Sequence, residues 1–419
     1  MDKILERLGT YRALNAATVQ FNSVVFRVVV GFLAGIPAHI IATIPAIEFV
    51  INFLLEIPTG RLADRFGRIP LAIIGHIAVI IGLSCGYVAL NIHSAHPELA
   101  YTLFILHGVF IGFNKPLTSG SVEAFYQDAL HRCEDRNEDL LYKSMTISKK
   151  YGKYLTTAAI VLSFASIFVM KESIGAHHAF VIGIILWALT LLKLYQDYSH
   201  LGDVTNEPTK INSILKMIVT SRRSWISIFY STSAFTLIGL VMGYFIVAIG
   251  REETGHLRWT LIIAFMLSSQ GLGWIVKSHI LPNLINKISE KNYLSIFYLS
   301  LSLLGILLYY FFRNLNPFLL IVFISILGIT FMTAVSAISS VAHNIIMSEV
   351  KKDDFAFAIS VQSMPGYLVI SLMSYIFSIY FDGTPSTEGI VLTMSVLSGG
   401  FFLGHIFIYR EKIATEALI

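Results

Sequence analysis

Charged residues are scarce in this chain. Only 13% of its 419 residues are Asp, Glu, Lys or Arg, whereas 55% are hydrophobic. A soluble protein carries about 25% charged residues, so this chain has too little polar surface to face water on all sides. Its main solvent must be lipid. The net charge of +4 is too small to indicate a nucleic-acid partner.

Cysteine is almost absent as well. Cys85 and Cys133 stand alone, which excludes a disulfide framework and the paired cysteines of many metal sites. The sequence also lacks the HExxH, GxSxG and P-loop patterns of common enzymes and ATPases. We therefore expect no enzyme activity, no metal or other cofactor, and no direct drive by ATP. The charged N-terminal residues do not resemble a signal peptide, so we expect the chain to begin in the cytoplasm.

Long apolar runs make up most of the chain. A membrane-spanning helix needs about 20 largely apolar residues, and we count twelve candidate segments. Gly and Pro residues mark breaks between several of them. The sequence therefore predicts an all-α integral membrane protein with twelve transmembrane helices. These helices cover residues 13–35, 40–60, 70–91, 98–128, 144–170, 174–196, 223–249, 259–281, 293–312, 316–347, 354–380 and 386–409.

Lysine and arginine are distributed unevenly between the predicted loops. With both termini in the cytoplasm, all but six of the 30 basic residues lie at the cytoplasmic side. The positive-inside rule favours this orientation. The exceptions are Lys171, Arg251, Arg258 and Arg313 outside, and Arg27 and Lys115 within the membrane.

The longest polar stretch divides the chain. Residues 197–222 are predicted to form a cytoplasmic linker between two six-helix bundles, 1–196 and 223–419. Another short polar segment, Gly60-Arg61-Leu62-Ala63-Asp64-Arg65-Phe66-Gly67-Arg68, separates the second and third apolar runs and is predicted to be a tight cytoplasmic turn. A degenerate copy, Pro282-x-x-x-Asn286-Lys287, occurs 222 residues later and supports an internal repeat.

The pattern Gly60-x-x-x-Asp64-Arg65-x-Gly67-Arg68 resembles the signature loop of the major facilitator superfamily of transporters. Two further segments are similar to a bacterial subgroup: Glu56-Ile57-Pro58-Thr59-Gly60, and Ser119-Gly120-Ser121-Val122-Glu123-Ala124-Phe125-Tyr126-Gln127-Asp128. The chain departs from the usual pattern in the fourth helix, where His107 and Gly108 stand in the region of an expected Arg. The resemblance implies two parallel six-helix repeats around a midplane site, alternating access, and a monomer in the bacterial cytoplasmic membrane.

The signature loop is also predicted to be a gate. Arg65 and Arg68 can pair with carboxylates from neighbouring helix ends, and breaking such pairs would bias the motion of the two halves. The alternative is that these charges only anchor the loop at lipid headgroups, which would not require glycines that permit close helix approach. The predicted gate residues are Gly60, Asp64, Arg65, Gly67, Arg68 and Asp128.

Two cations fall inside predicted membrane helices. Arg27 and Lys115 each lie about 20 Å from a cytoplasmic helix end, where a charge costs on the order of 3 kcal/mol or more. Because two cations at one depth repel each other, we infer an anionic substrate that bridges them. The alternative is a structural ion pair of Lys115 with Glu123 or Glu56. The other predicted substrate-binding residues are Gln20, Asn22, Ser23, Asn114, Ser119, Tyr230, Gln362 and Tyr367, of which Tyr230, Gln362 and Tyr367 can also be packing residues.

Coupling to protons needs a titratable group in a switchable, partly buried place. Glu123, Glu56 and His343 are the predicted candidates; Glu123 can instead pair with Arg65 or Arg68. The sequence thus favours a secondary active transporter of a small organic anion, for example a siderophore-like polycarboxylate, coupled to protons. The alternatives are a multidrug or metabolite exporter of the same superfamily, and a membrane enzyme or scaffold.

Overall fold

Every regular element that the computed structural model describes is a helix. The described residues are 2–33, 35–118, 122, 125, 155, 157–167, 172–201, 218–253, 255–269, 290–312, 314–349, 355–380 and 386–416. They divide into two compact units. Unit 1 comprises residues 1–218 and 350–383, and unit 2 comprises residues 219–349 and 384–419.

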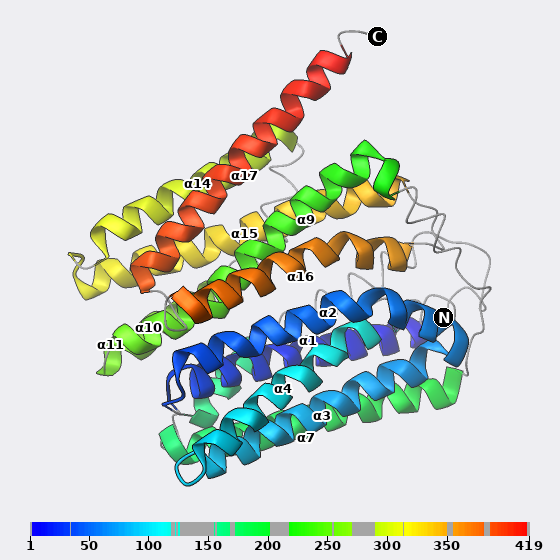
Figure 1. Ribbon diagram of the computed structural model, residues 1–419, viewed down its shortest axis with the longest axis vertical. Coiled ribbons are helices and arrows are strands. Elements are labelled where there is room, and N and C mark those ends of the chain that lie inside the picture. Colours follow the sequence, from blue (N-terminus) through cyan, green and yellow to red (C-terminus); the bar gives the residue numbers. More distant parts are fainter. Residues whose placement is uncertain are drawn as a thin grey trace. The chain divides into compact units, whose positions relative to one another are not determined.

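Unit 1 is a bundle of long helices (Figure 1). Helix α16, far away in the sequence, runs alongside α2 in this unit, while α4 packs between α2 and α3. The helices are α1 (Asp2–Val28), the π-helical turn η1 (Val29–Leu33), α2 (Ala38–Phe66), α3 (Arg68–Ile92), α4 (Pro97–Thr118), α7 (Glu172–Leu201) and α16 (Phe355–Tyr380). The short apolar helix Thr157–Ile167 also belongs here.

Unit 2 is helical too, with α9 packed on α15 and α14 on α17 (Figure 1). Its helices are α9 (Arg222–Leu240), the π-helical turn η2 (Val241–Phe245), α10 (Ile246–Glu252), α11 (Gly255–Leu267), α14 (Glu290–Phe311), α15 (Pro317–Glu349) and α17 (Thr387–Glu416). In both halves of the sequence, the first helix thus runs into a five-residue π-helical turn. This shared detail is consistent with the internal repeat.

Membrane spans are evident in both units. Among the described residues, six helices are long and apolar enough to cross a membrane, and two shorter apolar helices occur at Thr157–Ile167 and His256–Leu267. Each of the twelve predicted segments contains a described helix. The count of twelve complete spans, the orientation of the termini and the boundary at residues 197–222 remain predictions.

The N-terminal residues depart from the sequence expectation, because helix α1 begins at Asp2 rather than near residue 13. Its polar first turns are held to α7 by a buried carboxylate. Lys193 Nζ lies 2.6 Å from Asp197 Oδ2, and Arg7 Nη1 lies 3.4 Å from Asp197 Oδ1, while Asp197 is only 2% exposed. Most of these polar residues favour helix, so charge alone did not mark the end of the helix.

The predicted turn at residues 60–68 is tighter than its nine residues suggest. Helix α2 continues through Phe66 and α3 starts at Arg68, so Gly67 alone makes the reversal. Its backbone has φ 90° and ψ 145°, a conformation that residues with a Cβ atom rarely adopt. The requirement for glycine at this position of the motif therefore follows from the backbone.

We predict that Gly67→Ala destabilises the protein by about 1–3 kcal/mol, the usual cost of a strained backbone conformation. Thermal unfolding of the purified protein in detergent measures this. The matched control is Gly400→Ala in α17, because a Cβ atom there meets nothing within 4 Å. Equal melting temperatures for the two variants would contradict the assignment of the turn to Gly67.

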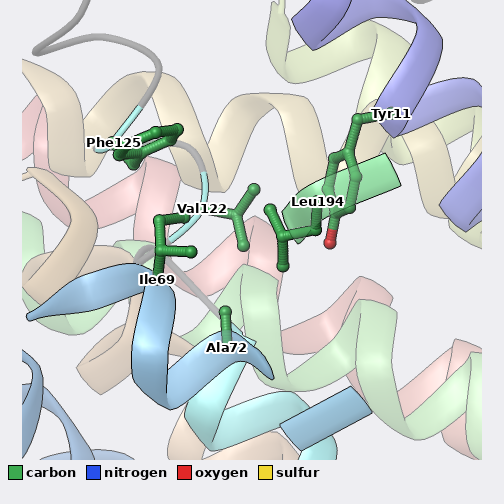
Figure 2. Packing of buried hydrophobic residues seen from close by; sticks show 6 residues of the cluster. All are labelled: Tyr11, Ile69, Ala72, Val122, Phe125 and Leu194. Atoms are coloured by element: carbon green, nitrogen blue, oxygen red, sulfur yellow. The ribbon is translucent and has the colours of Figure 1, made fainter. Parts of the chain in front are cut away.

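An apolar cluster lies beside this turn in unit 1. Figure 2 shows Ile69 and Ala72 of α3 with Val122, Phe125, Tyr11 of α1 and Leu194 of α7, all buried. Val122 and Phe125 belong to the second motif segment, residues 119–128. The 119–128 segment therefore packs against the start of α3, directly after the signature loop.

Candidate functional site

Helix α2 carries a buried polar stripe. Glu48, Asn52 and Glu56 follow one another at intervals of four residues, so they lie along one face of the helix. Asn52 is 1% exposed and Glu56 is 4% exposed, whereas Glu48 is half-buried. Because buried polar groups inside a membrane protein are costly, this stripe is the first indication of a site.

Helix α4 approaches this stripe closely because it has two glycines. A Cβ atom added at Gly108 would lie 3.0 Å from the carbonyl oxygen of Ile44, and one at Gly112 would lie 3.0 Å from the carbonyl oxygen of Glu48. The two helices are therefore parallel here, with nearly touching backbones. Lys115 lies three residues after Gly112, so this contact brings it to the polar face of α2.

Helix α16 also packs against α2. Ser371 Oγ donates a hydrogen bond to the carbonyl oxygen of Ala46 at 3.0 Å, and the rings of Phe49 and Tyr367 stack with centroids 6.0 Å apart. Residues earlier in α2 thus pair with later residues of α16, as expected for antiparallel helices. This register places Tyr367 at the level of the α2 polar stripe.

Lys115 connects all three helices. Its Nζ atom lies 4.4 Å from the centroid of the Tyr367 ring, a cation–π contact, and it also forms a side-chain hydrogen bond with Tyr367. Glu56 and Glu48 both attract it electrostatically. We call Glu48, Asn52, Glu56, Lys115 and Tyr367 the Lys115 cluster.

The charged end of Lys115 lies among buried groups. Lys115 as a whole residue is exposed, but its ammonium group lies over the ring of Tyr367, which is buried, as is Glu56. With both glutamates ionised the cluster carries one net negative charge, and each proton taken up makes it more positive.

The structure favours part of the alternative interpretation of Lys115, an ion pair with Glu56, because both Glu56 and Glu48 act on the lysine. The long lysine side chain can extend along the helix, so depth counted at the Cα atom misleads. Glu48 and Asn52 were missed, although their spacing with Glu56 was visible in the sequence.

Two predicted substrate-binding asparagines face other helices. Asn22 is 9% exposed, donates to the carbonyl oxygen of Thr18 at 2.9 Å, and its carboxamide fills the space beside Gly183 of α7. Asn114 shares a helix face with Leu117, which packs on Gly75 of α3. Asn114, which directly precedes Lys115, thus points in another direction than the lysine, because consecutive helix residues are turned by about 100°.

The remaining predicted lining residues have varied surroundings. Gln20 and Ser23 are half-buried on α1, and Gln362 is 4% exposed on α16. Tyr230 is buried in unit 2, where its hydroxyl forms a 2.8 Å hydrogen bond with His405 Nδ1. The side chain of Arg27, and residues Ser119, Glu123 and Asp128, lie outside the described residues.

The structure describes some of the residues that are predicted to form the gate and to couple transport to protons. Arg68 is half-buried at the start of α3, and His343 is half-buried in α15. Gly60, Asp64 and Arg65 have described helical backbones, but their side chains lie outside the described residues. The pairing of the gate charges stays a prediction. Figure 2 shows that Val122 and Phe125 of the 119–128 segment pack near Ile69, the residue that follows Arg68.

Glycines also bring α3 and α4 together, as the Gly82-x-x-x-Gly86 pattern predicts. A Cβ atom at Gly82 would lie 3.1 Å from Phe110 Cβ and one at Gly86 3.2 Å from His107 Nδ1. His107 Nδ1 lies 2.8 Å from the carbonyl oxygen of Gly82. Because a carbonyl only accepts, Nδ1 is the protonated nitrogen of this histidine. His107, which stands in the region of the expected Arg, thus links α4 to α3 through a hydrogen bond.

The part of the chain that the structure describes holds no group of three or more metal-ligating side chains.

Comparisons with solved structures place this fold among transporters. The nucleoside transporter NupG has a TM-score of 0.65 at 12% identity, covering 97% of this chain and 99% of that one. An inward-facing bacterial homologue of the iron transporter ferroportin has a TM-score of 0.63 at 12% identity, covering 97% and 99%. The E. coli fucose:proton symporter FucP has a TM-score of 0.57 at 11% identity, covering 96% and 98%.

These identities are too low to carry over a substrate. No curated protein sequence matches the chain significantly. The model of the Major Facilitator Superfamily, however, matches residues 12–374, which is most of the chain. The chain therefore belongs to the major facilitator superfamily, and this membership indicates a multi-pass membrane transporter rather than an enzyme.

Proposed function

We propose that the protein transports a small organic anion together with protons, by alternating access, as a monomer in a bacterial cytoplasmic membrane. The observation that carries the proposal is the Lys115 cluster, in which the ammonium group of Lys115 lies within the electrostatic reach of two carboxylates. An ammonium group is a charge-assisted hydrogen-bond donor, which suits an anion. Arg27, on the neighbouring α1, is the second cation of the proposed site.

The two glutamates supply the coupling in this proposal. While Glu48 and Glu56 are ionised, they compete with a solute anion for Lys115. Protonation of one glutamate weakens that competition, so an anion and a proton bind best together. By linkage, the bound anion raises the proton affinity of the glutamates by the same factor. On either side of the membrane, release of the anion or of the proton then favours release of the other.

The test uses the full-length protein in proteoliposomes with a pH-sensitive dye inside. We expect external organic anions, offered as a panel of mono-, di- and tricarboxylates, to acidify the lumen as they enter. Imposed proton gradients should drive uptake, and imposed sodium gradients should not. Anion uptake without acidification of the lumen would contradict the proposed coupling to protons. If no anion is taken up, the proposed class of substrate is wrong.

We predict that Glu56→Gln uncouples the proton flux from the anion flux. Because glutamine keeps the size but cannot ionise, lumen acidification should fall at least about tenfold, while exchange of internal for external anion persists. Glu48→Gln tests the second carboxylate in the same way. The control is Glu98→Gln, an exposed glutamate in the first turn of α4, which should behave as the wild type. Unchanged coupling in both cluster variants would contradict this role for the glutamates.

A second candidate function is export of organic cations. It is favoured by the net negative charge of the cluster and by the stacked rings of Phe49 and Tyr367, since aromatic faces bind cations. The same proteoliposomes distinguish the two functions. Transport of tetraalkylammonium ions or cationic dyes, with no transport of carboxylates, would favour export of cations.

A further inference from the structure

Asn52 has a hydrogen-bonding capacity that the described residues leave unused. Its side chain is 1% exposed, and its Oδ1 atom is buried without a hydrogen-bond partner in the described part of the chain. Leaving a buried polar atom unsatisfied costs about 1–3 kcal/mol. Such an atom at the centre of a proposed solute site calls for a ligand that satisfies it.

The position of Asn52 relative to the charges is fixed by helix geometry. It lies one turn from Glu48 and one turn from Glu56 on the same face of α2, so it stands about 6 Å from each along the helix axis. Both glutamates act on Lys115. A small solute with its anionic group at the ammonium of Lys115 therefore lies alongside Asn52.

The chemistry of this partner can be narrowed. A carboxylate only accepts hydrogen bonds, so it can satisfy the carboxamide nitrogen but not the oxygen. A hydroxyl group both donates and accepts, so it satisfies the carboxamide in either of its two orientations. Among the described residues near this level of α2, the ring of Phe49 has no polar atom, and Lys115 already bonds to Tyr367.

We propose that the solute is a hydroxy acid, and that Asn52 selects the hydroxyl group next to its carboxylate. This inference rests on the proposed anion transport and goes further, because it names the chemical class within the anions. It assigns separate tasks to two residues: Lys115 attracts the charge, and Asn52 distinguishes hydroxylated acids from acids that lack a hydroxyl.

The experiment compares acids that differ by a single hydroxyl group. Full-length protein in proteoliposomes is offered malate or succinate, and citrate or tricarballylate, at equal concentrations. We expect the hydroxylated member of each active pair to be taken up about 5–30-fold faster, the worth of one satisfied hydrogen bond of about 1–2 kcal/mol. Equal rates within a pair that is transported would overturn the inference.

Variants then test the residue. In Asn52→Leu, and in the smaller Asn52→Ala, the ratio of the two uptake rates within each pair should collapse to within about twofold, because the loss falls mainly on the hydroxylated acid. The matched control is Asn15→Leu in α1, which removes another asparagine whose Oδ1 has no partner in the described residues and should keep the wild-type preference. A preference that survives in both Asn52 variants would show that another group selects the hydroxyl.

Failure of this inference and failure of the proposed function give different results. If carboxylates are transported without any hydroxyl preference, the anion transporter stands and the role of Asn52 is wrong. If neither pair is transported while organic cations are, both proposals are wrong together.

Discussion

Lys115→Met is expected to lower anion transport by about 10–150-fold. Methionine keeps the length of the lysine side chain and can still pack on the Tyr367 ring, but it removes the charge. A charge-assisted contact contributes about 1.5–3 kcal/mol, and each 1.4 kcal/mol corresponds to a factor of ten. The two glutamates left behind can take up protons, so the protein should still fold. Initial uptake rates in proteoliposomes, normalised to inserted protein, measure the effect.

The conservative variant separates charge from shape. Lys115→Arg keeps the cation but replaces a compact ammonium by a planar guanidinium, so we expect a reduction of about tenfold rather than loss. Arg27→Ala tests the second proposed cation and should lower uptake to a similar extent as Lys115→Met. Wild-type uptake in both Lys115→Met and Arg27→Ala, with normal melting temperatures, would show that the anion binds elsewhere.

Gly112→Leu is expected to prevent normal assembly of unit 1. The Cβ atom alone would lie 3.0 Å from the Glu48 carbonyl oxygen and 3.0 Å from Ile51 Cβ, and the obstructing backbone of α2 cannot rotate away. Overpacking costs about 1–3 kcal/mol in cores that can adjust, and a leucine at a backbone contact should exceed that range. We expect little monodisperse protein after extraction and a melting temperature well below that of the wild type.

Gly400→Leu in α17 is the matched control for this packing prediction. The same substitution there meets open space, since nothing lies within 4 Å of the added Cβ atom. It should express and melt as the wild type. If Gly112→Leu also folds normally, the close contact between α2 and α4, and with it the placement of Lys115 in the cluster, is wrong.

Much of the fold could be predicted because lipid imposes a simple rule. Apolar runs long enough to span a bilayer must be helical, so each predicted segment contains a described helix. The ends of helices were less predictable. The polar residues at the start of α1 remain helical because they pack on α7 through Asp197, and the turn before α3 needs only Gly67.

The site was predictable to a lesser extent. The depth of Lys115 could be counted along its helix, and its isolation in an apolar run marked it as functional. Its partners could not be predicted in the same way, because sequence gives the depth of a side chain but not the helix that it faces. Asn114, its neighbour in sequence, lies on the face toward α3, whereas Tyr367, 252 residues away, stacks against Lys115.

The pairing of α16 with α2 has a consequence for biosynthesis. Tyr367 follows Phe49 by 318 residues, so at about 5–20 residues per second α2 is made roughly 15–60 s before α16 can cover it. Helix α4 is made soon after α2. During that interval Lys115 is an available counter-ion for Glu48 and Glu56, and it lowers the cost of holding an acidic helix in the nascent bundle. The residue proposed to attract the solute would thus also serve the ribosome-bound chain, long before any solute can bind.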